Sequence, residues 1–453
     1  MWPFPLHPYA AGRPLAGQPL IRVGSRRWFL EVGAAGLGGA LFPGLMQAQT
    51  NSLSPTADKK SVILLWLSGG PSHIDMWDPK PHAPQNIRGP YGTIPTKIPG
   101  VHFSEHLPRQ ASIADKLTIL RSVDCSASNH TPITMQAGNS LARRTNDGKD
   151  GAGYPSMGSV AAKFRGPNDP RMPAFVGLAD SWASDVWGAG HMGSEYAPVQ
   201  GLRMADELAL PEGITVPRIE DRENLRRELH RFGQRADHHP LLDKMDRNTR
   251  RAYEMVLSGK VKKAFNIEEE SQATRDAYGK ESIGQKALLA RRLVEAGVTF
   301  VLVSGAWGYF DHHGDNVRWG GIVKGLTPLL PRVDQVLATL VNDLEQRGLL
   351  DSTLILMMGE FGRSPKINKE AGRDHWLPVM SMVMAGGGLR HGQVIGSTDP
   401  HGGSIASRPV SPEDLAATTY RHLGIDLNAH WTDPVGRPIP LIKNAGRPIA
   451  ELF

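Results

Sequence analysis

The sequence contains one cysteine, Cys125, among its 453 residues. A single cysteine excludes an internal disulfide framework and a cysteine-based zinc cluster. Its place directly after an apolar run is typical of a buried core position. Runs of Lys and Arg are also missing, and the formal net charge of +6 is modest for this length. We therefore expect no binding to nucleic acid.

Long apolar runs are absent as well. The best candidate, residues 32–46, is short and rich in Gly and Ala, whereas a membrane span needs about 20 apolar residues. It follows Arg26 and Arg27 in the pattern SRRWFL and precedes a small-residue site. This order predicts a twin-arginine signal peptide over residues 1–48 and a linker over 49–60. An ordinary amphipathic helix is the alternative.

A twin-arginine signal implies a destination as well as a route. We expect the protein to meet the twin-arginine export machinery as a partner and to work in the periplasm or outside the cell. No stable membrane span is expected after processing, because no later segment is long and apolar enough.

Short apolar runs alternate with helical patterns along the rest of the chain. Buried strands are predicted at residues 61–67, 117–123, 298–303, 353–358 and 380–384, and helices at 283–296, 321–348 and 411–423. This alternation predicts an α/β fold with a doubly wound, mainly parallel sheet flanked by helices. We expect one domain over residues 61–453, with a charged helical insertion at about 211–285.

Carboxylate and histidine side chains follow the predicted strands by only a few residues. In chain order they are Asp75, His130, Asp311 with His313, and Glu360, followed by Asp374 and His375 on a later loop. Because parallel strands end at one edge of a sheet, these groups should converge. Mixed oxygen and nitrogen ligands suit a divalent cation. Any one of them alone is more often a loop hydrogen-bonding group than a ligand, and Asp374 could simply pair with Arg373 or cap the backbone of Trp376.

Several longer motifs resemble a known family. These are LSGGPSHIDMWDPKP, FDHHGDN, GEFGRSP and GRDHW, followed by an arm with GGG, QVIGSTD and RPV. They resemble the exported family called domain of unknown function 1501 over about residues 61–453. That family looks like a branch of the alkaline phosphatase/sulfatase superfamily. The resemblance implies an alkaline phosphatase/sulfatase-like fold with one or two divalent ions (Zn, Ca, Mg or Mn) at the strand ends.

The nucleophile of that superfamily is a Ser, a Thr or a formylglycine. The segment SNHTP at residues 128–132 occupies the place of the sulfatase Cys-x-Pro-x-Arg motif and has no cysteine, so formylglycine has no precursor there. Ser72 and Thr131 are the candidate hydroxyl groups. A metal-activated water molecule is the other option.

The resemblance also suggests roles for the remaining residues. Asp311, His313 and His375 would hold one ion, with Asp75 and either Asp374 or Glu360 at a second ion or in the outer shell. The guanidinium groups of Arg363 and Arg373 would bind the oxygens of an oxyanion. His130 would act as an acid or a base.

The function predicted on this basis is an exported, metal-dependent hydrolase of phosphate or sulfate esters. Its substrate would be a small or polymeric anionic ester. A non-catalytic ligand-binding protein on the same fold is the alternative. The strand at 353–358 leads into Glu360 and Phe361, where the superfamily has Asp-His or Asp-Asn, and this departure favours the alternative.

Overall fold

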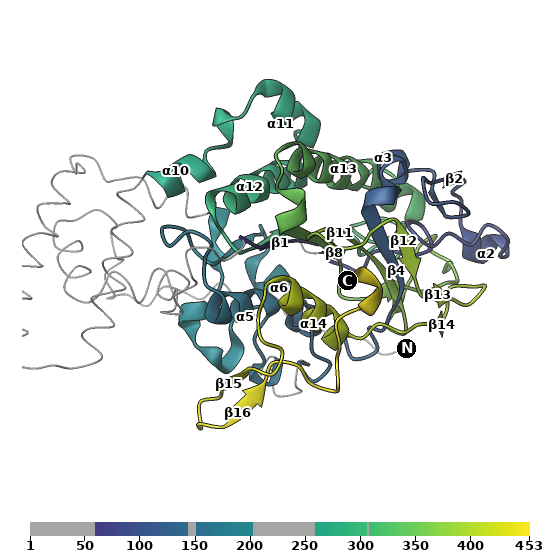
Figure 1. The fold of residues 1–453 in the computed structure, drawn as a ribbon. Helices are drawn as coiled ribbons and strands as arrows, with labels where there is room; N and C mark the ends of the chain where they lie inside the picture. The colour runs from purple at the N-terminus through teal and green to yellow at the C-terminus, as the bar shows by residue number, and fades with distance from the viewer. Residues whose placement is uncertain (1–58, 144–150, 203–258, 306–307) are drawn as a thin grey trace, which may run out of the picture.

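The computed structural model describes residues 59–143, 151–202, 259–305 and 308–453 (Figure 1). The predicted signal peptide lies outside the described residues, as do nearly all of the linker and most of the predicted insertion.

A mixed sheet of eight strands crosses the molecule in the order β12-β4-β11-β8-β1-β7-β5-β6. The strands are β1 (Ser61–Trp66), β4 (Leu117–Val123), β5 (Phe175–Leu178), β6 (Val199–Gln200), β7 (Phe300–Ser304), β8 (Thr353–Met358), β11 (Met380–Gly386) and β12 (Gln393–Ile395). Neighbouring strands are parallel except where β11 runs antiparallel to both β4 and β8. The expected α/β architecture with a mainly parallel sheet is confirmed.

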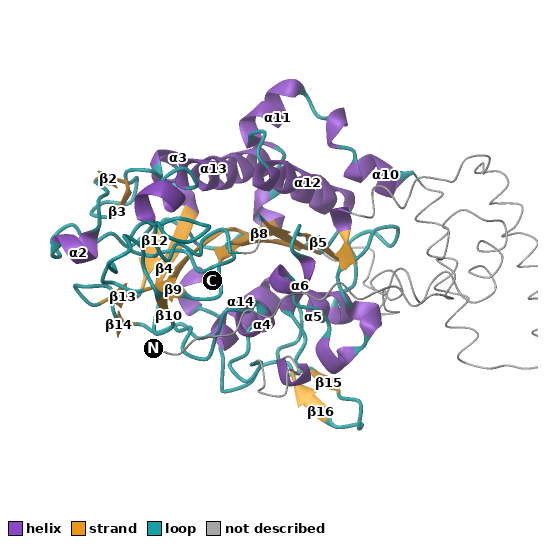
Figure 2. Cartoon of the chain, turned by 180° about the vertical axis from the view of Figure 1, so that it is seen from behind, coloured by secondary structure: helices purple, strands orange, loops and turns teal. Residues whose placement is uncertain are grey.

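The central strand β1 is buried over its whole length because helices cover both faces of the sheet. Ile63 and Leu65 belong to one apolar core and Val62 and Leu64 to the other, as the two-residue period of a strand requires. Figures 1 and 2 show one pair of helices on each face. These are α12 (Ser282–Ala296) and α13 (Leu330–Gln346) on the first face, and α5 (Met157–Phe164) and α14 (Pro412–His422) on the second.

The ends of these helices follow from local sequence chemistry. Ser411 caps α14 in a capping box with Asp414, and Gly297 ends α12 in the left-handed conformation. The continuous helix expected over residues 321–348 is wrong at its start. A short π-helical turn spans Ile322–Leu326, and α13 begins only at Leu330. Pro331 lies in the first turn of α13, where a missing N–H is tolerated.

Short helices and two-stranded ribbons complete the described fold. The helices are α2 (Gln85–Arg88), α3 (Pro108–Ser112), α4 (Ile133–Ala137), α6 (Trp182–Asp185), α10 (Lys260–Phe265) and α11 (Gln272–Tyr278). The ribbons pair β2 (Thr93–Pro95) with β3 (His102–Ser104), β9 (Gly362–Arg363) with β10 (His375–Trp376), β13 (Ser397–Thr398) with β14 (Ile405–Ser407), and β15 (His430–Thr432) with β16 (Pro438–Pro440). None of the helices in the described ranges has the length and apolarity needed to cross a membrane.

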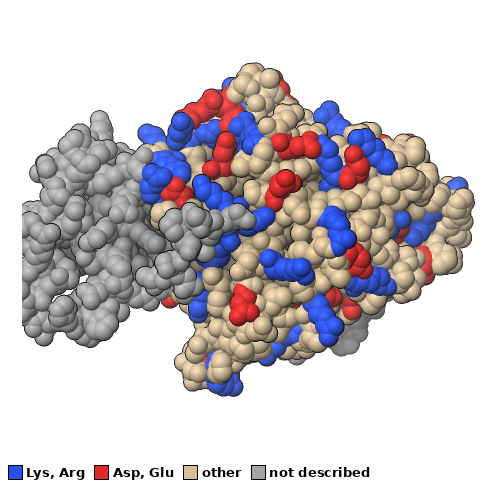
Figure 3. Space-filling view, viewed as in Figure 1, with Lys and Arg blue, Asp and Glu red and all other residues tan. Residues whose placement is uncertain are grey.

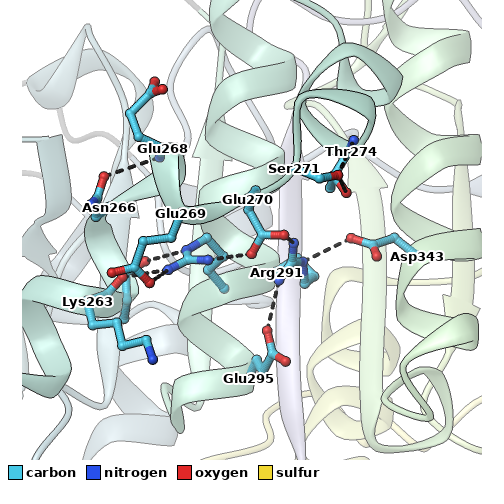
Figure 4. A network of polar contacts seen from close by, with 12 residues as sticks. Lys263, Asn266, Glu268, Glu269, Glu270, Ser271, Thr274, Arg291, Glu295 and Asp343 are labelled. Atoms are coloured by element: carbon cyan, nitrogen blue, oxygen red, sulfur yellow. Dashed lines mark hydrogen bonds and ion pairs between the residues drawn. The ribbon is translucent and has the colours of Figure 1, made fainter.

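A buried arginine ties the 260–278 region to the helices on the first face of the sheet. Arg291 on α12 is fully buried, and its three nitrogens contact Glu270 at 2.8 Å, Glu295 at 2.8 Å and Asp343 of α13 at 2.9 Å (Figure 4). The buried guanidinium therefore joins three segments that are distant in the chain. On the surface of this region, other basic side chains gather over α10, with acidic side chains beside them (Figure 3).

Replacing Arg291 by Met should lower the free energy of unfolding by about 2–4 kcal/mol, because three carboxylates lose their buried partner. Arg347→Met is the matched control. Arg347 contacts the same three carboxylates but is about one-third exposed, so its loss should cost at most about 1 kcal/mol. Urea denaturation measures both values, and equal costs would contradict the importance of burial.

Candidate metal centre

The predicted site residues come from loops at one edge of the sheet. His130 follows β4, Asp311 and His313 follow β7, and Glu360 follows β8. These three strands run in the same direction, so their carboxyl ends meet at this edge. His375 reaches it from the short ribbon in which β10 pairs with β9.

Three of the predicted ligands form a close triangle. The Nε2 atoms of His313 and His375 are 2.9 Å apart. The Oδ1 atom of Asp311 lies 3.0 Å from Nε2 of His375 and 3.1 Å from Nε2 of His313. Ligand atoms that share one zinc ion at about 2.0–2.1 Å lie roughly 3 to 3.5 Å from one another. The triangle therefore has the dimensions of one face of a metal coordination shell.

His130 lies on the other side of Asp311. Its Nε2 atom is 3.5 Å from Oδ2 of Asp311, and the ligand atoms of His130, Asp311 and His375 all lie within 4.8 Å of one another. The family resemblance gave His130 the role of an acid or a base. The geometry adds it to the donor set, which then consists of three imidazoles and one carboxylate.

Two carboxylates lie behind histidines of this cluster. Oε1 of Glu360 is 2.9 Å from Nδ1 of His130 and also accepts the backbone N–H of Gly69 at 2.8 Å. Oδ1 of Asp374 lies 3.5 Å from Nδ1 of His313. Histidines that bind metals commonly have such a carboxylate on the second ring nitrogen, where it fixes the tautomer. This placement matches an outer-shell position for Glu360 and Asp374.

The cluster is partly buried and electrostatically coupled. Side-chain exposure is 25% for His130, 32% for His313 and 31% for His375. Burial disfavours the charged form of Asp311, but hydrogen bonds with the three histidines and the charge of Arg363 hold its pKa well below the usual range. Burial also opposes charge on His130, yet its two carboxylate partners raise its pKa to about 9. Burial lowers the pKa of His375.

Arg363 contacts two members of the cluster, Asp311 and His313. Its side chain is buried, and its Nη2 group donates to Oδ1 of Asp311 at 2.5 Å and to the carbonyl oxygen of Gly69. Nε donates to Gly70 at 3.1 Å and Nη1 to the carbonyl of Arg373 at 3.0 Å, with Nη1 also 3.4 Å from the cluster's His313. Four of the five N–H groups of the guanidinium thereby donate to protein oxygens.

Arg373 and Asp75 form a separate buried pair. Nε and Nη2 of Arg373 donate to the two carboxylate oxygens of Asp75 at 2.6 and 2.9 Å. The remaining N–H groups of Arg373 donate to three backbone carbonyls, those of Ile87, Ser364 and Pro365. Ser72 also donates to Asp75, at 2.6 Å. Asp75 is therefore held by protein donors and is not part of the histidine cluster.

Two expected roles are not supported by these contacts. The guanidinium groups of Arg363 and Arg373 were expected to bind the oxygens of a substrate. Protein oxygens already accept from all five N–H groups of Arg373 and from four of the five of Arg363. Ser72 is buried and bonded to Asp75. Thr131, by contrast, is partly exposed beside His130, and its hydroxyl donates to Oδ1 of Asn129 at 2.6 Å.

A glycine explains how the loop after β1 lies so close to Asp311. Gly69 has φ = +106°, and a Cβ atom there would lie 2.5 Å from the backbone nitrogen of Asp311. Its N–H is also the one that binds Glu360. The sequence shows only that Gly69 permits a sharp turn after a strand. The close approach becomes visible only in the folded chain.

One protein family matches nearly all of the chain beyond the predicted signal peptide. A family described as "Protein of unknown function (DUF1501)" matches residues 59–453. The chain belongs to this family. The family match confirms the resemblance seen in the sequence motifs. No curated protein matches the chain.

The solved structures that match this DUF1501 protein share little sequence with it. "Ps i-CgsB" has 11% identity and a TM-score of 0.40, and covers 82% of this chain and 73% of its own. PsFucS1 sulfatase from Pseudoalteromonas sp. has 14% identity, a TM-score of 0.38, and coverage of 81% and 68%. Phosphonate monoester hydrolase SpPMH from Silicibacter pomeroyi has 10% identity, a TM-score of 0.37, and coverage of 86% and 76%.

Replacing Arg373 by Met should lower the free energy of unfolding by about 3–5 kcal/mol, because the carboxylate of Asp75 would stay buried without its cation. Adding Asp75→Asn to this variant should recover part of the loss, since the unpaired charge is then removed. Arg408→Met is the matched control, because Arg408 makes an exposed pair with Glu451, and it should cost at most about 1 kcal/mol. Thermal or urea denaturation measures the three values. A double variant that recovers none of the loss would contradict the pairing.

Proposed function

We propose that this protein is an exported, metal-dependent hydrolase of phosphate or sulfate esters. The observation that carries the proposal is the triangle of Asp311, His313 and His375, whose ligand atoms lie 2.9 to 3.1 Å apart. His130 adds a fourth donor on the far oxygen of Asp311. Three ligand atoms within 3.1 Å of one another, with a third imidazole on the second oxygen of the same carboxylate, are not typical of ordinary surface polarity.

The donor set supports a choice of metal. Three imidazole nitrogens and one carboxylate suit zinc or a similar borderline cation. Calcium and magnesium prefer sites made entirely of oxygen ligands. One ion at this cluster is better supported than two, because Asp75, a candidate for a second ion, is occupied by Arg373. Glu360 and Asp374 would orient the histidines rather than bind the ion themselves.

A divalent cation at this position would polarise an ester oxygen and lower the pKa of a nearby hydroxyl or water. The protein's own contribution is to hold the donors rigidly through Arg363 and Glu360. Of the two candidate hydroxyl groups, Thr131 is the accessible one, since Ser72 is buried and donates to Asp75. Attack by Thr131 or by a water molecule is therefore the proposed chemistry.

One observation favours the alternative of a non-catalytic ligand-binding protein on the same fold. All N–H groups of Arg373 and four of the five of Arg363 are bonded to protein oxygens, which leaves at most one N–H of the pair for the oxygens of an anionic substrate. A hydrolase would then need the metal itself to neutralise the charge that develops on the ester.

The cellular setting is proposed from the sequence. Arg26 and Arg27 lie in a twin-arginine pattern outside the described residues, which supports export of the folded protein to the periplasm or beyond. The single domain over residues 61–453 would then meet a small or polymeric anionic ester in that compartment.

The mature protein should contain close to one equivalent of zinc or a similar metal by elemental analysis. The Asp311→Ala/His375→Ala variant should contain none, because two of the donors are gone. The control is Asp426→Ala/His430→Ala, an exposed Asp and His at the β15 ribbon, which should keep its metal. Absence of metal from all three proteins would sink the hydrolase proposal.

With metal present, phosphate and sulfate ester substrates separate the two functions. Thr131→Ala should lower kcat by at least about 100-fold if its hydroxyl is the nucleophile. Ser72→Ala should leave kcat within a few-fold. A metal-loaded wild type without esterase activity would favour the binding-protein alternative.

A further inference from the structure

A buried carboxylate beneath the site bridges two strand ends. Asp185, the last residue of α6, is fully buried. Its Oδ1 atom accepts from the hydroxyl of Ser68 at 2.8 Å, just after β1, and its Oδ2 atom accepts from the hydroxyl of Ser304 at 2.7 Å, the last residue of β7. One carboxylate thus holds the carboxyl ends of two neighbouring strands.

Both strand ends lead directly into the candidate metal centre. The hydroxyl of Ser68 accepts the N–H of Gly308 at 3.3 Å, and the N–H of Asp311 in turn donates to the carbonyl of Gly308 at 2.8 Å. The residue after Ser68 is Gly69, whose N–H binds Glu360. Three hydrogen bonds in series therefore lead from Asp185 to the proposed ligand Asp311. Two hydrogen bonds and the peptide link from Ser68 to Gly69 lead to Glu360, the carboxylate behind His130.

A third contact links Asp185 to the loop that carries His130. The backbone carbonyl of Asp185 accepts from the side chain of Gln136 at 2.7 Å. Gln136 lies in α4, the short helix that follows His130. The oxygen of the same side chain accepts the N–H of Trp187 at 2.8 Å. The two ends of the Gln136 amide thus lock α4 against the segment around Asp185.

We propose that Asp185 is a positioning residue of the candidate metal centre, which fixes Asp311 and Glu360 through the two strand ends that its carboxylate bridges. This inference rests on the proposed metal site. Asp185 itself touches none of the proposed ligands in the contacts described above. No signal in the sequence singled it out, because its partners lie 117 and 119 residues away.

The protonation of Asp185 offers a way to separate positioning from general stability. Burial raises its pKa to about 6, an effect that the Ser304 and Ser68 hydroxyls reduce. Of the charged groups nearby, Glu360 raises the pKa further and Lys286 lowers it. Above this pH both carboxylate oxygens accept hydrogen bonds. Below it, one oxygen carries a proton, and the carboxyl group accepts hydrogen bonds through the other oxygen.

The test is the zinc affinity of wild type and Asp185→Asn, measured with zinc chloride by competition with a chromophoric chelator. The Asn side chain has one acceptor oxygen at every pH, as the protonated acid does. At about pH 8 the variant should bind zinc about 3- to 10-fold more weakly than wild type, a loss at or below the range for direct outer-shell changes. At about pH 5 the two affinities should be nearly equal, because wild-type Asp185 is then mostly protonated.

Asp334→Asn is the matched control. Asp334, in α13, is also a buried carboxylate with a raised pKa. It accepts hydrogen bonds from the backbone N–H groups of Arg109 and Gln110 in α3. Its replacement should leave zinc affinity unchanged at both pH values. If Asp185→Asn fails to fold, Ser304→Ala removes one of the two bridging contacts and should weaken zinc binding in the same direction at about pH 8.

The outcomes are distinct. Equal affinity in wild type and Asp185→Asn at both pH values would overturn the inference and leave the proposed function standing. A loss that is independent of pH, or one shared by Asp334→Asn, would reduce Asp185 to a general stabilising residue and also overturn it. A wild type that binds no zinc would overturn the proposed metal site and the inference together.

Discussion

The ion pair between Arg363 and Asp311 joins two loops that are 52 residues apart in the chain. A buried guanidinium is tolerated only when its charge is paired and its N–H groups find acceptors. Arg363 meets this demand with one carboxylate and three backbone carbonyls, two of which lie in the turn after β1. Satisfying this single cation therefore sets how the loops after β1, β7 and β8 approach one another.

A second buried cation extends the same constraint. Arg373 lies ten residues beyond Arg363 and donates to Asp75, and its carbonyl accepts from Arg363. The carbonyl of Arg373 thus connects the two buried guanidinium groups. Because Arg363 forms its hydrogen bonds within the protein, it holds Asp311 in place before any ligand arrives, which is the condition for electrostatic preorganisation.

The polar groups of this edge contrast with the strands that lead to it. β1 and β8 are buried and almost wholly apolar along their length, and polarity begins where they end. Hydroxyl, carboxylate and imidazole groups there form hydrogen bonds with one another. A buried polar network of this kind is stable only when nearly all of its members are paired, so the site and the integrity of the sheet edge depend on each other.

The sequence by itself determined the α/β architecture, because strand and helix periods, glycine turns and helix caps act over a few residues. It also placed His130, Asp311, Glu360 and His375 at strand ends or on the loop beside them, and these residues do meet. Only the tertiary structure decided which atoms face one another. Residues more than 100 positions apart are joined by the ion pair of Arg373 with Asp75 and by the bridge that Asp185 makes between Ser68 and Ser304. Such contacts follow from how the strands are ordered in the sheet and leave no local pattern to detect.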